Sequence, residues 1–403
     1  MNGVVVAGAG PAGLAAALAL ARAGIRVTVL ERENELPRRP RACTFHPATL
    51  DLLDELGVAS RLVAAGRVVD RVQWRDRSGM VLAEMGMNRL DGLTRHPFRM
   101  HLDQASLTAL LLEALNACPE AEVRFGAHVD GVAEGGTGVR VRVGHTWTLG
   151  RYLIAADGAQ STVRGALGLP LPRSAHQAQA LRVFVDSPLD RMLPSLAPLT
   201  HVRDLQQSCT LFGLPDHWRI IFKIPCDAHE PLSPSNLSLL VRRALPGLGG
   251  PIRITGADRF WLSRGVLSSY RCGRVLFVGD AAHLTSTVGG LNMNAGIHDA
   301  VELAGVITAV IGGQAPAAAL EAWAWRRRSV VLQRVLPPRE ARRMGVREHD
   351  SARLDAATAG LRAIAGDPDA TRAYLAQASL LDTVPHTASW AASRAVPNPV
   401  GRS

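Results

Sequence analysis

The chain has 403 residues, of which 47% are apolar and 20% are charged, and this composition excludes disordered, collagen-like and low-complexity proteins. At roughly 150 residues per domain, the length predicts two or three domains. The formal net charge is +10, but the 45 basic residues include only one lysine, Lys223, and they are spread along the chain. We therefore expect no nucleic-acid partner, because proteins that bind nucleic acids concentrate positive charge in one stripe or tail.

The cysteines indicate the redox compartment of the protein, and the uncharged stretches indicate whether it has a membrane segment. No C-x-x-C pair and no histidine at ligand spacing accompanies the five cysteines, which are Cys43, Cys118, Cys209, Cys226 and Cys272. This pattern favours a reducing compartment, so we expect a cytoplasmic protein with no metal. The uncharged stretches 3–21 and 303–320 contain glycines and a proline, which are not typical of a signal peptide or a membrane-spanning helix, and we expect no membrane partner.

The first residues predict a β-α-β unit around a glycine-rich turn. Residues 4–6 are β-branched, 14–23 are rich in alanine and leucine, and 25–30 form a second apolar run. The turn between strand and helix reads G-x-G-x-x-G, through Gly8, Gly10, Pro11, Ala12 and Gly13. In a dinucleotide site the first glycine makes the tight turn, the second lets the backbone approach a pyrophosphate, and the third permits close helix packing.

Glu31 closes the second strand, where a carboxylate accepts hydrogen bonds from an adenosine ribose. The same carboxylate would repel a 2′-phosphate, so the site favours FAD or NAD over NADP. The helix N-terminus supplies free N–H groups and partial positive charge for the phosphates. A glycine-rich turn in another kind of α/β protein is the alternative interpretation.

Three downstream motifs resemble those of the class A flavoprotein monooxygenases, the family of para-hydroxybenzoate hydroxylase and the aromatic polyketide hydroxylases. Residues 153–164, around Asp157 and Gly158, are similar to its "DG" motif. Residues 274–283, which contain Asp280, resemble its "GD" motif, and residues 289–300 resemble its flavin-facing loop and the helix that follows. Smaller similarities include Arg41 and the helix start at Gln104.

The resemblance implies an α/β fold with a Rossmann-like FAD-binding domain. An α+β substrate domain on a mostly antiparallel sheet is inserted into it, and helices follow at the C-terminus. We expect the FAD-binding domain at 1–70, 97–169 and 263–335, the substrate-binding domain at 71–96 and 170–262, and a helical segment and tail at 336–403. The chain resembles a two-domain member without the family's additional thioredoxin-like domain.

The resemblance also implies an activity. The expected enzyme is a monooxygenase with non-covalent FAD that consumes NAD(P)H and O₂, and hydroxylates an electron-rich aromatic or polyketide-like small molecule through a flavin hydroperoxide. Secondary-metabolite biosynthesis and a monomer or homodimer are the associated expectations. The residues expected to contact FAD are Gly8, Gly10, Pro11, Ala12, Gly13, Glu31, Arg32, Arg41, Gln104, Val129, Asp157, Gly158, Asp280, Gly290, Leu291 and Asn292.

The sequence departs from the family pattern beside the flavin, with Thr287 in place of proline and Asn292 in place of glycine. The departures leave two alternatives open. One is a flavoenzyme of the same fold with Baeyer–Villiger, decarboxylating or redox-neutral chemistry, and the other is a flavin-bound scaffold without turnover. If the loop lies where the resemblance places it, the amide of Asn292 donates a hydrogen bond to the flavin or its peroxide, or its bulk narrows the pocket and selects substrate shape. We favour the hydrogen bond.

The catalytic residues are not determined by the sequence. Asn292, His201, Arg203 and Arg219 are the candidates, and for the last three the pattern favours polar surface residues of a sheet over residues that bind a phenolate or carboxylate. His283 follows the "GD" motif and is expected to be a packed or helix-capping histidine. The arginine-rich run 326–353 predicts a solvated helix face.

Overall fold

The chain begins with the β-α-β unit that its residue pattern predicts. The computed structural model describes residues 3–39, 41–172, 178–205, 207–224, 232–285, 288–336 and 351–384. Strand β1 (Val4–Ala7) leads into helix α1 (Pro11–Arg22), and β2 (Val27–Leu30) follows, two residues later than expected. Gly24 ends the helix with a φ of 77°, which glycine adopts without steric cost.

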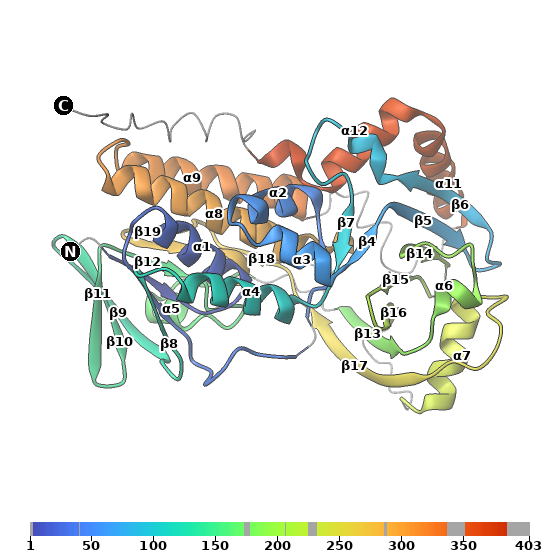
Figure 1. The fold of residues 1–403 in the computed structure, drawn as a ribbon, viewed down its shortest axis with the longest axis horizontal. Coiled ribbons are helices and arrows are strands. Elements are labelled where there is room, and N and C mark those ends of the chain that lie inside the picture. The colour runs from blue at the N-terminus through green and yellow to red at the C-terminus, as the bar shows by residue number, and fades with distance from the viewer. Residues whose placement is uncertain are drawn as a thin grey trace, which may run out of the picture.

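These strands form the centre of a six-stranded sheet, which is parallel except at β19. Helix α1 packs between α4 and α8, and α8 and α9 run side by side across this half of the molecule (Figure 1). In order across the sheet its strands are β19 (Arg271–Cys272), β20 (Val275–Phe277), β12 (Tyr152–Ala155), β1, β2 and β8 (Ala121–Arg124). Helices α4, α8 and α9 span Gln104–Asn116, Leu291–Ile311 and Ala318–Val330.

Three smaller sheets surround the six-stranded sheet. The first consists of β3 (Thr44–Phe45), β7 (Arg99–His101) and β4 (Arg67–Val69). The second consists of β9 (Val129–Gly135), β10 (Gly138–Val143) and β11 (Thr146–Gly150). The third pairs β18 (Gly265–Val266) with β21 (His283–Leu284). The short helices nearby are α2 (Pro47–Glu55), α3 (Ala59–Ala65) and α5 (Thr162–Ala166).

A seven-stranded sheet makes the other half of the molecule. Neighbouring strands in this sheet are antiparallel, except β14 and β5, which are parallel. Its order is β17 (Ile254–Leu262), β13 (Ala178–Val185), β16 (Trp218–Ile224), β15 (Cys209–Gly213), β14 (Leu199–Arg203), β5 (Arg71–Asp76) and β6 (Val81–Gly86). The expected α/β class with an antiparallel second sheet is confirmed. The exact domain boundaries stay a prediction.

One face of this second sheet carries its own apolar core. Trp218 and Phe222 pack there with Leu237 and Val241 of α7 (Pro234–Ala244), and the short helix α6 (Leu189–Met192) lies alongside. The alternate residues of β16 point the other way, and Arg219 is one of them. Its interpretation as a polar surface residue is wrong, because it is 1% exposed and its guanidinium lies between the two halves of the molecule.

The C-terminal helices α11 (Ser351–Gly366) and α12 (Pro368–Ala378) pack on the edge of the second sheet (Figure 1). Leu361 and Leu375 join Trp74 and Met85 of β5 and β6 in one apolar cluster. Helices were expected over 340–382, and the described part of this range, from 351, bears that out. The expected loose tail lies within 385–403, outside the described residues, as do residues 337–350 of the arginine-rich run.

Helix α8 belongs to the protein core although it is long and apolar. By length and composition its 21 residues could cross a membrane, but 67% of its most apolar window is buried inside the protein. Its neighbour α9 brings Arg327 to full burial, where the guanidinium donates to Asp299 Oδ1 at 2.7 Å. The expectation of a solvated arginine face is therefore wrong at Arg327, because a buried carboxylate on α8 supplies its counter-charge.

We predict that a buried histidine of α8 makes stability fall in acid. His298 lies 2.8 Å from Thr49 Oγ1, and burial lowers its pKa to about 3. The folded protein therefore keeps this ring neutral, whereas the unfolded chain takes up a proton below about pH 6.5. Stability is full above that value and is lost as the pH falls. His298→Gln should reduce the loss of unfolding free energy between about pH 7.5 and pH 5 by about 2 kcal/mol.

Urea unfolding at the two pH values measures this effect. His145→Gln is the matched control, because His145 is exposed and its substitution should leave the pH dependence unchanged. An identical pH dependence in His298→Gln and the unmodified protein would contradict the assignment.

Candidate functional site

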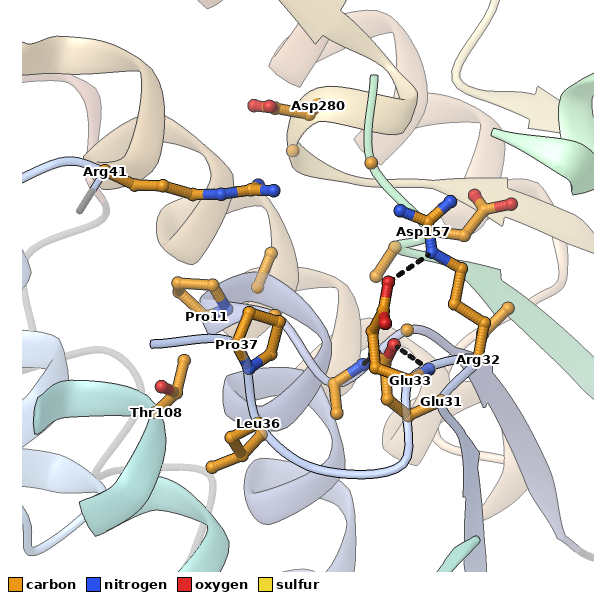
Figure 2. A pocket seen from close by; sticks show the side chains of 18 of the residues that line it. Pro11, Glu31, Arg32, Glu33, Leu36, Pro37, Arg41, Thr108, Asp157 and Asp280 are labelled. Carbon is orange, nitrogen blue, oxygen red and sulfur yellow. Dashed lines mark hydrogen bonds and ion pairs between the residues drawn. The ribbon is translucent and has the colours of Figure 1, made fainter. Parts of the chain in front are cut away.

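A cavity of about 540 Å³ opens where the carboxyl ends of β1, β2, β12 and β20 meet (Figure 2). Parallel strands end at one edge of a sheet, so residues far apart in sequence converge there. Of the residues expected to contact FAD, those that line the cavity are Gly8, Gly10, Pro11, Ala12, Glu31, Arg32, Arg41, Gln104, Val129, Asp157, Gly158, Asp280 and Asn292.

Three of the expected contact residues lie behind the cavity wall. A Cβ on Gly13 would stand 2.0 Å from the carbonyl oxygen of Gly8, so glycine here lets α1 pack against the turn. Gly290 has a φ of 65°, and a Cβ there would stand 2.2 Å from Thr44 Cγ2. Leu291 begins α8 and packs against the apolar core. These residues shape the loop without lining the cavity.

The wall is open where a pyrophosphate would need access. A Cβ on Gly10 would meet no heavy atom within 4 Å, and its backbone is extended, with a φ of −74°. No side chain of the described residues caps α1, which begins immediately after Gly10. The first N–H groups of this helix are therefore available to an anion in the cavity.

Two carboxylates organise the loops around the opening. Glu31 is 7% exposed, and its Oε2 and Oε1 accept hydrogen bonds from the backbone of Ala9 and Glu33 at 2.6 and 3.0 Å. Asp157 Oδ2 accepts from Val163 N at 3.0 Å, whereas its buried Oδ1 has no partner among the described residues. Glu31 and Asp157 thereby hold the loops that border the cavity.

The opposite end of the cavity holds Asp280 and Arg41. Figure 2 shows the guanidinium of Arg41 extending between Pro11 and Asp280. Burial raises the pKa of Asp280, and the positive charges of His283 and Arg41 oppose this rise. At the other mouth, Arg32 pairs with Glu33 at 3.3 Å, and both side chains are about half exposed.

Asn292 connects Asp280 to a buried histidine. Its amide nitrogen donates to Asp280 Oδ1 at 2.6 Å, and its amide oxygen accepts from His283 Nδ1 at 3.1 Å and from Thr285 Oγ1 at 3.0 Å. The Nε2 of His283 lies 2.8 Å from Asp299 Oδ2. Both ring nitrogens of His283 therefore have an oxygen within hydrogen-bond distance, and these contacts hold the ring between Asn292 and Asp299.

Buried charges at this chain of contacts lie next to charges of the opposite sign. Arg327 donates to Asp299 and lies 3.8 Å from Glu302 Oε2, and the positive charge of Arg41 acts on Asp280. Burial alone would raise the pKa of Asp299, but the Arg327 guanidinium and His283 hold it below its usual value. The expected packing of His283 in the interior is borne out, since it is fully buried.

Of the two departures from the family pattern, Asn292 and Thr287, the structure describes only Asn292. Asn292 lines the cavity as expected, but its amide nitrogen already donates to Asp280. Whether it also donates to a flavin stays a prediction. Thr287 lies outside the described residues.

The other catalytic candidates do not line this cavity. His201 lies 3.0 Å from Thr210 Oγ1 and 5.5 Å from the ring of Trp74, and burial lowers its pKa to about 3. Arg203 ends the same strand, β14. Arg219 donates to the carbonyl of Arg41 at 2.8 Å and to Asp103 at 2.5 Å. Arg219 therefore ties the second sheet to the loop beside the cavity, which is a positioning role.

Sequence reasoning missed several residues that line the cavity. Thr108 lies one helical turn after Gln104, so the spacing along α4 could have indicated it. The loop residues carry no such periodic signal. The missed lining residues include Leu36, Pro37, Thr108, His128, Gln160, Met293 and Gly296.

We predict that removing the Asn292 amide destabilises the protein before any ligand is added. Asn292→Ala leaves Asp280 Oδ1 and His283 Nδ1 without their partner, and an unsatisfied buried group costs about 1–3 kcal/mol. Urea unfolding of the ligand-free protein measures the loss. Comparison of Asn292→Gly with Asn292→Ala shows how much stability depends on the backbone at this position. Asn88→Ala, at an exposed position, is the control. Equal stability of Asn292→Ala and the unmodified protein would contradict the role of the amide.

Comparison with known proteins places this geometry in a family. The family described as FAD binding domain matches residues 1–336 of the chain. Para-nitrophenol 4-monooxygenase of a Pseudomonas species is 29% identical over 87% of this chain and 89% of its own length. A 12-dehydrotetracycline 5-monooxygenase/anhydrotetracycline 6-monooxygenase of Streptomyces rimosus is 32% identical over 86% of this chain and 72% of its own.

Solved structures agree with the sequence comparison. The crystal structure of p-nitrophenol 4-monooxygenase from Pseudomonas putida superposes with a TM-score of 0.87 at 27% identity, over 95% of this chain and 98% of that one. A complex of aklavinone-11 hydroxylase with FAD and aklavinone gives a TM-score of 0.73 at 26% identity, over 86% and 69% of the two chains. The cavity at the sheet edge, the matched domain and these relatives together show that the chain belongs to the FAD-dependent monooxygenase family.

Proposed function

We propose that the protein hydroxylates an electron-rich aromatic or polyketide-like small molecule, with non-covalent FAD as cofactor, NAD(P)H as transient reductant and O₂ as oxidant. The observation that carries the proposal is the single cavity that reaches from Glu31 to Asp280 beneath the uncapped start of α1. Two of its relatives, a para-nitrophenol 4-monooxygenase and a 12-dehydrotetracycline 5-monooxygenase/anhydrotetracycline 6-monooxygenase, support the substrate class.

The residues present fit FAD along the whole cavity. The N–H groups at the start of α1 would hold the pyrophosphate, and Glu31 would accept from the ribose hydroxyls. Asp280 and the free oxygen of Asp157 would accept hydrogen bonds from hydroxyl or ring N–H groups nearer the flavin. Bound FAD supplies electron transfer from NAD(P)H to O₂ and the delivery of one oxygen atom to the substrate.

The chain's own residues prepare the electrostatics at the flavin end. Helix α8 starts at Leu291 with no capping side chain among the described residues, so its positive end faces the Gly289–Gly290 loop. Arg327 is already paired with Asp299, so the uncapped start of α8 is what favours negative charge on a group bound beside the loop. Burial strengthens this effect because water is excluded.

Location and assembly remain part of the proposal. A reducing, cytoplasmic compartment is supported by the free thiols of Cys43, Cys118, Cys209 and Cys272. A monomer or a homodimer is the assembly we propose. A flavin-bound scaffold without turnover, and a same-fold enzyme with Baeyer–Villiger or other flavin chemistry, are the alternatives that the activity test below separates.

We predict that Glu31→Ala weakens FAD binding about 10- to 150-fold, the equivalent of 1.5–3 kcal/mol for hydrogen bonds to a charged group. Fluorescence titration of the ligand-free protein with FAD gives the dissociation constant. Glu33→Ala is the matched control, because Glu33 also lines the cavity but is exposed and paired with Arg32. Unchanged FAD affinity in Glu31→Ala would refute the assigned ribose contact.

The activity itself is tested by NAD(P)H oxidation in air with a panel of phenols and polyketide-like aromatics. We expect slow oxidation that a true substrate accelerates, with a product heavier by one oxygen that derives from labelled O₂. No oxidation with any member of the panel would favour the scaffold. Insertion of the oxygen into a ring or beside a carbonyl, seen by NMR of the product, would favour Baeyer–Villiger chemistry.

A further inference from the structure

A second cavity lies at the opposite edge of the six-stranded sheet, and we call it the distal cavity. Its volume is about 430 Å³, within the range of about 300–1,000 Å³ that is typical of small-molecule sites. Strands β12 and β20 begin beside it, whereas their carboxyl ends border the first cavity. Helix α8 reaches both cavities, through Asn292 and Val310, and about 27 Å of helix separates these residues. A small ligand in the distal cavity would therefore not touch one in the first.

Three arginines and one acidic residue line the distal cavity. Arg151 lies immediately before β12, Arg271 starts β19, and Arg274 ends the turn that joins β19 to β20. The acidic residue is Glu134 of β9. Because β12 pairs with β20 and β20 with β19, the three arginines come from neighbouring backbones. The lining residues thus bring three positive charges and one negative charge together.

Two of the three arginines have no anionic partner among the described residues. The side chain of Arg151 makes no hydrogen bond or ion pair with any of them, and the guanidinium of Arg274 lies over the ring of Tyr152, 5.7 Å from its centroid. The third, Arg271, lies 3.6 Å from Glu321 of α9. Arg151 and Arg274 are partly buried, which weakens the screening of their charges by water. Their mutual repulsion is relieved when an anion joins them.

The other two charged residues hold the backbone around the distal cavity. Arg271 donates to the carbonyls of Gly273 and Ala317 at 2.9 and 3.2 Å, so it ties the β19–β20 turn to the start of α9. Glu134 Oε1 accepts a hydrogen bond from the backbone N–H of Arg274 at 3.0 Å. These contacts shape the cavity and leave the two unpaired guanidinium groups available to a ligand.

The helix ends beside the distal cavity do not determine the sign of its charge. Val310 lies in the last turn of α8, where a helix carries partial negative charge. Ala317 lies immediately before α9, where a helix carries partial positive charge. Because these two partial charges oppose each other, the arginines determine the preference for an anion.

We propose that the distal cavity binds the phosphoryl group of a small molecule, with Arg151 and Arg274 as the residues that hold it. A guanidinium presents a planar pair of N–H donors that matches two phosphate oxygens, and such charge-assisted contacts are among the stronger hydrogen bonds. Inorganic phosphate and a phosphate ester share this chemistry. The site goes beyond the proposed function, because it depends neither on turnover nor on the substrate.

Calorimetry on the FAD-loaded protein without NAD(P)H tests the site, because FAD then occupies the first cavity. The ligands are inorganic phosphate, AMP and adenosine, at constant ionic strength in chloride. We expect phosphate or AMP to bind at one site per chain, and the tighter of the two identifies the source as free phosphate or an ester. Adenosine, which lacks the phosphoryl group, should not bind. Absence of binding by both phosphate and AMP, or equal binding of AMP and adenosine, would overturn the proposal.

Arg151→Met and Arg274→Met should each lower the affinity for the preferred anion at least about tenfold, as expected for loss of a hydrogen bond to a charged group. Arg191→Met is the matched control, because it removes the same charge from an exposed position on α6, in the other half of the molecule. Arg151→Met should keep the melting temperature of the ligand-free protein, so it carries the test even if Arg274→Met folds poorly. Unchanged anion affinity in Arg151→Met would overturn the proposal.

Glu134→Gln separates the charge of the distal cavity from its shape. Glutamine keeps an oxygen that can accept from the N–H of Arg274, but it removes the negative charge that opposes a bound anion. We expect Glu134→Gln to bind the preferred anion several-fold more tightly than the unmodified protein. Equal or weaker binding would contradict the electrostatic basis of the site.

Discussion

Close backbone contact between two helices and two strand ends determines where every group of the site lies. Gly13 allows α1 to approach the carbonyl of Gly8, and a Cβ on Gly296 of α8 would stand 2.9 Å from the Cα of Gly279. A Cβ on Gly279 would in turn stand 3.3 Å from the Cβ of Ala12. Because only small residues stand at these contacts, both helix N-termini reach the edge of the sheet beside one cavity. The positive ends of α1 and α8 are therefore both placed to interact with an anion in that cavity.

Charge compensation differs between the two polar regions of the interior. Asp299, His283 and Arg327 compensate one another without a ligand, and removal of one member would leave an uncompensated buried charge. Arg99 has no such carboxylate among the described residues. The first arrangement ties α8 to α9 and to β21.

Local patterns predicted the parts of the site that are formed by neighbours in sequence. The glycine-rich turn, Glu31 and the start of α1 follow from one β-α-β unit, and Asp157 and Asp280 came from motifs with a strand immediately before them. The partners of Arg327 and Asn292 could not be predicted, because Asp299 and His283 reach them only through the packing of α8, α9 and β21. The pairing of β3 with β7 could not be predicted either, because the two strands are far apart in sequence.

The central claim is that the open backbone at Gly10 receives the pyrophosphate of FAD, and Gly10→Val tests it most directly. The added side chain would point into the cavity, where no heavy atom lies within 4 Å, and extended backbone accepts valine. We expect the unfolding free energy of the ligand-free variant to stay within about 0.5 kcal/mol of the unmodified protein, the usual range for a change that disturbs no contact. We expect its FAD affinity, measured in the same preparation, to fall by about 100-fold or more, a loss of about 3 kcal/mol. Unchanged FAD affinity in a stably folded Gly10→Val variant would contradict the account.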